Sequence, residues 1–145
     1  IPLPKPKKTF TQLEKDRFAR ASFNYIKEYF KEGLKKLKKD DPDVETDIED
    51  ITSLQFTSKI YVRGDIKAEC NIWLGDTFGR NSICYNEGTR RIGTNSINES
   101  ITVEDNGEEL GLHVGLFGVR EQKMATQQQA AEYLWTRFTS PLQSR

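Results

Sequence analysis

Two runs of alternating apolar and polar residues, 54–62 and 66–74, constrain the fold of this chain more than any other feature. They flank the turn sequence Arg63-Gly64-Asp65. Alternation is the period of a strand with one buried face, and the glycine supplies the positive φ that a tight reversal needs. The pattern therefore predicts a β-hairpin.

The remaining patterns predict three more strands and two helices. A short strand is expected at 82–85, and a second hairpin at 97–104 and 108–114 around Asp105-Asn106-Gly107. Capping-box pairs, Thr11 with Glu14 and Thr126 with Gln129, open a helix over 11–39 and another that Pro141 ends. Adjacent hairpins favour an antiparallel sheet. The predicted class is α+β: a five-stranded antiparallel sheet, with a long N-terminal helix and a C-terminal helix packed on one face.

Two positions near the first helix carry specific expectations. Gly33 lies inside the predicted helix, where glycine costs about 1 kcal/mol relative to alanine, so we expect a close packing partner or a bend there. Seven acidic residues follow within 40–50. We interpret them as a solvated loop that neutralises the lysine-rich end of the helix, since a calcium loop would need a glycine and a terminal glutamate in register.

The opening of the chain has the composition of a linker. Residues 2–8 alternate prolines with other residues and end in lysines, which favours an extended polyproline segment. We therefore predict that residues 1–9 are the remnant of an interdomain linker and that 10–145 form a single α+β domain. A covalently linked N-terminal domain is the first partner that this organisation implies.

Composition argues against several classes of function. Twenty-two basic residues balance twenty-two acidic ones, so nucleic acid is an unlikely partner, although Lys27, Lys31, Lys35 and Lys38 line one face of the first predicted helix. No apolar run is long enough to span a membrane. Two cysteines and one histidine rule out the common zinc frameworks, so neither a metal nor a cofactor is predicted. The expected location is cytoplasmic, where Cys70 and Cys84 are more often free than paired.

The segment 75–96 is the candidate ligand-binding region. It is polar and rich in glycine, and it carries three arginines: Arg80, Arg90 and Arg91. Arginines held near Trp73, on the solvent side of its strand, have the chemistry to bind a phosphate while the indole stacks on a base. The alternative is a flexible loop with solvated arginines, because the segment matches no ordered phosphate-binding loop.

Catalytic residues are harder to find. Acid–base chemistry would have to come from Glu99, Glu104 or His113, and His113 has no cysteine or serine nucleophile at an informative spacing. A catalytic thiol is disfavoured because an apolar setting raises the pKa of a buried cysteine. No catalytic residue is therefore assigned, and the domain is predicted not to be an enzyme.

Four segments together resemble a known family: Phe10-Thr-Gln-Leu-Glu-Lys-Asp-Arg-Phe18, Cys70-Asn-Ile-Trp-Leu-Gly75, Asn95-Ser-Ile-Asn-Glu-Ser-Ile-Thr-Val-Glu-Asp105 and Gln129-Ala-Ala-Glu-Tyr-Leu-Trp135. They are similar to the C-terminal region of bacterial proteins that begin with a Toll/interleukin-1 receptor (TIR) domain. The resemblance covers residues 10–143 in order. It implies that the chemistry, often NAD cleavage in anti-phage defence, belongs to a TIR domain outside this chain, and that the appended domain senses, binds or assembles.

These observations leave two main hypotheses about function and two minor ones. The first is a non-catalytic regulatory, sensing or assembly domain of a larger bacterial protein, with Trp73 and Tyr61 on a sheet face that a second copy of the chain would cover. The second is a nucleotide sensor that uses Trp73, Arg80, Arg90 and Arg91. A small stand-alone enzyme and a nucleic-acid-binding module are the minor alternatives.

Overall fold

The computed structural model describes residues 2–4, 9–77, 80–87, 97–115 and 123–143. Its elements follow the chain as one helix, six strands and a second helix. They are α1 (Gln12–Asp40), β1 (Val44–Thr52), β2 (Gln55–Val62), β3 (Asp65–Thr77), β4 (Arg80–Glu87), β5 (Glu99–Asp105), β6 (Leu110–Val114) and α2 (Gln127–Gln143).

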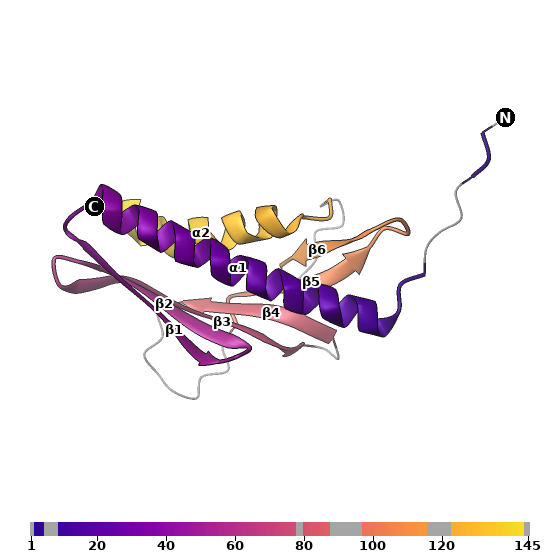
Figure 1. The fold of residues 1–145 in the computed structure, drawn as a ribbon, viewed down its shortest axis with the longest axis horizontal. Helices are drawn as coiled ribbons and strands as arrows, with labels where there is room; N and C mark the ends of the chain where they lie inside the picture. Colours follow the sequence, from indigo (N-terminus) through magenta and orange to yellow (C-terminus); the bar gives the residue numbers. More distant parts are fainter. Residues whose placement is uncertain (1, 5–8, 78–79, 88–96, 116–122, 144–145) are drawn as a thin grey trace.

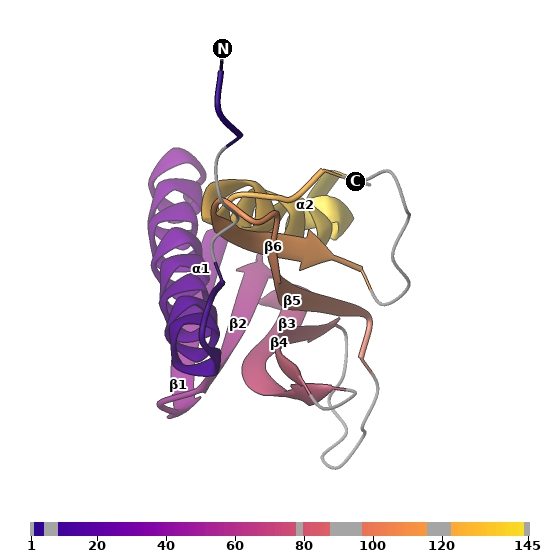
Figure 2. The same ribbon diagram turned by 90° about the vertical axis from the view of Figure 1, so that its right-hand side faces the viewer.

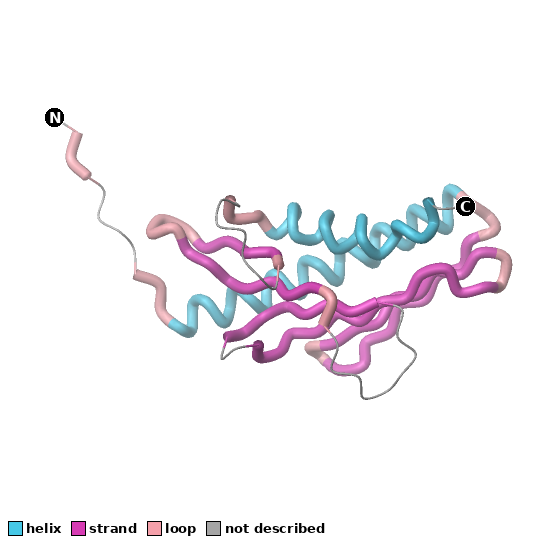
Figure 3. Tube along the Cα trace, turned by 180° about the vertical axis from the view of Figure 1, so that it is seen from behind, coloured by secondary structure: helices cyan, strands magenta, loops and turns pink. Residues whose placement is uncertain are grey.

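The six strands form one antiparallel sheet in the order β1-β2-β3-β4-β5-β6, so each strand pairs with its neighbour in sequence. Both helices cover the same face of this sheet (Figures 1 and 2). Seen from behind, the helices again lie on one side of the strands (Figure 3). The predicted class, α+β with an antiparallel sheet and two terminal helices, is confirmed.

The prediction of five strands was wrong, because the acidic segment 40–50 was taken for a loop. Most of it is β1, whose register with β2 pairs Thr46 with Ile60 and Asp47 with Lys59. Val44 and Ile48 point toward α1 as Ile60 does, while Glu45, Asp47 and Glu49 occupy the opposite face. Strand alternation was therefore present, hidden by acids on the solvent-facing positions.

The first hairpin confirms its prediction with a shorter turn. Val62 pairs directly with Asp65, leaving a two-residue turn in which Arg63 has φ 50° and Gly64 has φ 87°. Positive φ at both central positions is the geometry whose twist matches that of the flanking strands. The predicted short strand at 82–85 extends over Arg80–Glu87.

Both predicted capping boxes are present. In α1, the Glu14 amide donates to Thr11 Oγ1 at 3.1 Å and the Thr11 amide donates to Glu14 Oε1 at 3.1 Å. Thr126 and Gln129 exchange the equivalent pair at 3.1 and 3.0 Å before α2. The α1 positions that pack against the sheet recur at helical spacing: Ala19, Ser22, Phe23, Ile26, Phe30 and Leu34.

Pro141 does not end α2, which continues to Gln143. A proline removes the amide that would bond to the carbonyl four residues earlier. Here that carbonyl belongs to Arg137, and Ser140 Oγ donates to it at 2.9 Å. The hydroxyl replaces the missing donor, so the last turn tolerates the proline.

Gly33 has the close packing partner that its position predicted. A Cβ atom at Gly33 would lie 2.6 Å from Trp135 Cη2, so only glycine leaves room for the indole of α2 against α1. Trp135 also contacts Phe30 and Phe138 edge-on, with ring centroids 5.2 and 5.8 Å apart. This aromatic cluster joins the two helices above the sheet.

Candidate functional site

Trp73 lies where the alternation placed it, on the face of β3 opposite the helices. It pairs with Cys84 of β4, while its neighbours Ile72 and Leu74 contribute to the core. The indole is partly exposed and lies along Gly75, whose hypothetical Cβ would be 3.2 Å from Trp73 Nε1. Neither described helix covers this face (Figures 1 and 2), but Ser82, Cys84 and Asn86, which share it with Trp73, are buried.

Of the three arginines in the predicted site, one lies in the part of the chain that the structure describes. Arg80 begins β4 and pairs with Thr77, four positions along β3 from Trp73. Four residues of strand span about 13 Å, so a ligand bridging Trp73 and the Arg80 position would need to be nucleotide-sized. Arg90 and Arg91 lie outside the described residues.

The three candidate acid–base residues divide between the two faces of the sheet. His113 Nδ1 lies 3.5 Å from Glu104 Oε2 on the face opposite the helices. Glu99 points to the helix-covered face, where it contacts α2. The structure therefore brings two of the three together and separates the third.

Cys70 and Cys84 do not form a disulfide, although their strands pair. Cys70 is opposite Glu87 and Cys84 is opposite Trp73, so the two thiols point to opposite faces of the sheet. Both side chains are buried. Burial raises the pKa of the Cys70 thiol well above its usual range, which makes it a poor nucleophile.

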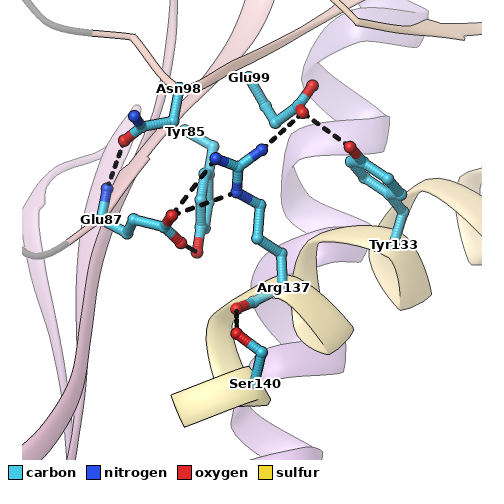
Figure 4. A network of polar contacts seen from close by, with 7 residues as sticks. All are labelled: Tyr85, Glu87, Asn98, Glu99, Tyr133, Arg137 and Ser140. Carbon is cyan, nitrogen blue, oxygen red and sulfur yellow. Dashed lines mark hydrogen bonds and ion pairs between the residues drawn. The ribbon is translucent and has the colours of Figure 1, made fainter.

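The most extensive polar cluster of the described residues was not predicted. It centres on Arg137 of α2, which contacts one carboxylate from β4 and one from β5 (Figure 4). Arg137 Nη1 donates to Glu99 Oε1 at 2.7 Å, and Nε and Nη2 both donate to Glu87 Oε1 at 3.3 Å. Its guanidinium also lies 5.8 Å from the centroid of the Tyr85 ring.

Two tyrosines complete this cluster. Tyr133 Oη donates to Glu99 Oε1 at 2.6 Å, and Tyr85 Oη donates to Glu87 Oε2 at 2.8 Å. The Glu87 amide in turn donates to Asn98 Oδ1 at 2.9 Å. Each carboxylate thus receives a phenol and the guanidinium, and α2 is fastened to the middle of the sheet.

These contacts and burial change the pKa values of three side chains in the cluster. The hydrogen bond to Glu99, with a smaller effect of burial, raises the pKa of Tyr133. Burial raises the pKa of Tyr85 far above its usual range, and the hydrogen bond to Glu87 adds to the effect. Burial opposes the charge of Arg137, but the hydrogen bonds and charges of Glu87 and Glu99 outweigh it and raise the pKa of the guanidinium.

These interactions limit what the cluster does chemically. Two carboxylates against one guanidinium leave a net negative charge, and the cation is already bonded to both acids. The arrangement disfavours an anionic ligand at Arg137 and fits a positioning role between helix and sheet. Across residues 2–4, 9–77, 80–87, 97–115 and 123–143, no group of His, Cys, Asp and Glu side chains has the arrangement of a metal site.

The four lysines that line α1 all have acidic partners. Lys27 reaches Asp50 at 3.0 Å and Lys38 reaches Glu45 at 3.1 Å, which ties α1 to β1. Lys31 and Lys35 pair with Glu28 and Glu32 along the helix at 3.4 and 3.7 Å. The lysine face is therefore locally compensated. Neither described helix is long and apolar enough to cross a bilayer.

A family profile described as Y4lF protein domain matches residues 45–140, which is more than half of the chain. The chain belongs to the Y4lF domain family. The matched region runs from β1 into α2 and includes Trp73, Glu87, Glu99 and Arg137.

A relative named "Uncharacterized protein y4lF", from Sinorhizobium fredii (strain NBRC 101917 / NGR234), is 33% identical over 139 residues. That match covers 94% of this chain but 43% of the relative, so the chain spans less than half of the relative's length. No solved structure matches the chain.

The sequence contains only a weak signal for the Arg137 cluster. Arg137 follows Tyr133 by four residues, so the two share a face of α2, but Glu87 and Glu99 are 50 and 38 residues away. Glu87 belonged to the segment interpreted as a polar loop, and Glu99 was considered only as an acid–base candidate. Contacts of this separation follow from the sheet register, which the local patterns do not specify.

Proposed function

We propose that this chain is a non-catalytic regulatory or sensing domain of a larger bacterial protein. The observation that carries the proposal is the match to the S. fredii relative, which extends over nearly all of this chain but under half of the relative. A unit of this kind, joined to a longer chain, is suited to control or recruit rather than to act alone.

The proposed working surface is the part of the sheet around Trp73, on the face opposite the helices. Trp73 is partly exposed there, and its indole lies against Gly75, which carries no side chain. A planar base stacks on such a surface, and the Arg80 position lies within the span of a nucleotide. A nucleotide is therefore the ligand class that we propose.

The neighbour that we propose is a TIR domain N-terminal to this chain, as the resemblance of residues 10–143 implies. Its NAD-cleaving chemistry would be controlled by the state of this domain, in the cytoplasm and in response to phage. The proline-rich residues 2–8 fit the linker between the two domains.

The experiment is a thermal-shift screen of this chain with NAD, ADP-ribose, mononucleotides, cyclic dinucleotides and a short oligonucleotide. A ligand at one hundred times its Kd stabilises by about 2.7 kcal/mol, a shift of several degrees at this size. We expect one nucleotide to give this shift and Trp73→Ala or Arg80→Ala to abolish it. Arg20→Ala, an exposed arginine on α1, is the matched control. A shift that survives Trp73→Ala contradicts the proposed surface.

A further inference from the structure

The sheet around Trp73 is buried on one side of the indole and partly exposed on the other. Cys84, opposite Trp73 on β4, is buried, whereas Gln55, opposite Trp73 on β2, is partly exposed. Asn71, two residues before Trp73 on β3, points to the same face and is also partly exposed. Two primary amides therefore border the indole on its partly exposed side.

The Asn71 amide is held in one orientation. Its Nδ2 donates to Oδ1 of the buried Asn86 at 3.0 Å, which uses one of its two N–H groups. Within the described part of the chain, the second N–H and Oδ1 of Asn71 have no other hydrogen-bond partner, and neither has the Gln55 amide. Asn71 therefore presents an acceptor and a donor in fixed positions, while the Gln55 amide can rotate.

The nearby lysine on this face is already paired. Lys59 Nζ lies 3.6 Å from Glu69 Oε2, and the two side chains are only 33% and 12% exposed. Lysine and arginine are the usual partners of guanine, through O6 and N7, whereas asparagine and glutamine pair with adenine through N6 and N7. Amides beside the indole, with the lysine engaged, favour adenine over guanine.

These groups lie in a line along β3. Asn71, Trp73 and Gly75 are alternate residues of the strand, and the Arg80 position pairs with Thr77 further along. Alternate residues of a strand are about 7 Å apart. A base stacked on Trp73 therefore reaches the Asn71 amide with one edge, while its ribose and phosphate extend over Gly75 toward the Arg80 position.

We propose that the nucleotide bound at Trp73 is an adenine nucleotide and that Asn71 determines this specificity. The N6 amino group donates to Asn71 Oδ1, and a ring nitrogen beside it accepts from the remaining N–H of Nδ2. The inference rests on the proposed nucleotide function and adds to it the identity of the base and the residue that recognises it.

The bond to Asn86 explains how a single amide discriminates. Hypoxanthine carries a carbonyl oxygen where adenine carries the amino group, so it would place an acceptor against the acceptor of Asn71. An amide that could rotate would present its N–H groups instead, but rotation of Asn71 breaks its bond to Asn86. Gln55, which has no such bond, accommodates both bases.

The experiment compares adenosine and inosine monophosphate, AMP and IMP, by calorimetry on the parent chain and two variants. The parent should bind AMP about fivefold or more tighter than IMP, as one bidentate amide–adenine pair requires. Asn71→Leu, of similar size, should remove this preference by weakening AMP to the level of IMP. Gln55→Met is the matched control, because loss of a rotating amide should weaken both ligands alike. Circular dichroism checks that each variant is folded.

A third ligand tests the contact without changing the chain. N6,N6-dimethyl-AMP keeps the ring, ribose and phosphate of AMP but has no N–H at N6. The parent should bind it no more tightly than IMP. Binding equal to that of AMP overturns the contact between N6 and Asn71.

The outcomes separate this inference from the function on which it rests. Equal Kd values for AMP and IMP in the parent, or binding of a different nucleotide in a manner that depends on Trp73, overturn the adenine assignment and leave the nucleotide-binding surface standing. Binding of no nucleotide at all overturns both. A preference for AMP that survives in folded Asn71→Leu, or that Gln55→Met removes, overturns the role of Asn71.

Discussion

At the scale of single residues, two positions determine how α2 joins its neighbours. Gly33 admits the Trp135 indole on one side of α2, and Arg137 bonds to Glu87 and Glu99 on the other. The first is a contact that only a missing side chain allows, and the second is a network in which every member has a partner. Both sets of contacts fix the position of α2 against α1 and the sheet.

Gly33→Ala is expected to destabilise the domain, although alanine has a higher helix propensity than glycine. The substitution gains about 1 kcal/mol in propensity, but the new Cβ would lie 2.6 Å from the Trp135 ring, which Phe30 and Phe138 hold in place. Overpacking of this kind costs about 1–3 kcal/mol. Urea denaturation should therefore show a net loss of stability. In Trp135→Leu the same substitution should be neutral or stabilising, and equal effects in both backgrounds contradict the packing argument.

Tyr133→Phe is expected to cost stability near neutral pH and to cost less at high pH. The pKa of Tyr133 is raised in the folded chain, so its contribution is fully present below the unfolded pKa of about 10 and is lost as pH rises through the folded pKa. We expect the substitution to cost about 1 kcal/mol at pH 8, from the lost bond to Glu99. The difference from the parent should shrink above pH 11, as measured by denaturation at each pH. A constant difference contradicts the assignment.

At the scale of elements, the predictions that the structure confirms rest on locally encoded patterns. Hairpins, capping boxes and the packed face of α1 depend on residues close together in the chain, and the structure confirms them. β1 was missed because acids hide its alternation, and Pro141 was misread because Ser140 supplies the lost donor. For the candidate site, the sequence predicted only which face of the sheet carries Trp73. The Arg137 cluster could not be predicted, because it depends on the register between β4 and β5.

The acidic side chains of β1 lie on an edge strand, where their charge opposes pairing with other chains. β1 ends the sheet order, and Asp47 and Glu49 are exposed on it. Unpaired strand edges invite pairing with other chains, and charges oppose it. Asp47→Thr/Glu49→Thr should keep thermal stability within about 0.5 kcal/mol, since threonine suits strands. It should also increase time-dependent light scattering on mild heating. Glu108→Thr/Glu109→Thr, in the turn before β6, is the control; equal scattering by both pairs contradicts the role.

At the scale of the whole molecule, the domain presents two distinct surfaces. The sheet face opposite the helices carries the partly exposed Trp73, and the helix layer carries a groove lined by Tyr25 and Trp135. The Arg137 cluster fixes the helix layer that separates them. In our account, a ligand bound at Trp73 acts on the attached neighbour through this domain. Regulation, rather than chemistry, is what the arrangement serves in our account.

The central claim is that this domain controls a catalytic neighbour without catalysing anything itself. The most direct measurement is NAD turnover by the complete protein, by its N-terminal part and by this chain alone. We predict turnover by the complete protein, none by this chain, and altered turnover in the complete protein when Trp73→Ala is introduced. NAD cleavage by the isolated chain, or turnover by the complete protein that is indifferent both to Trp73→Ala and to removal of residues 10–145, contradicts the account.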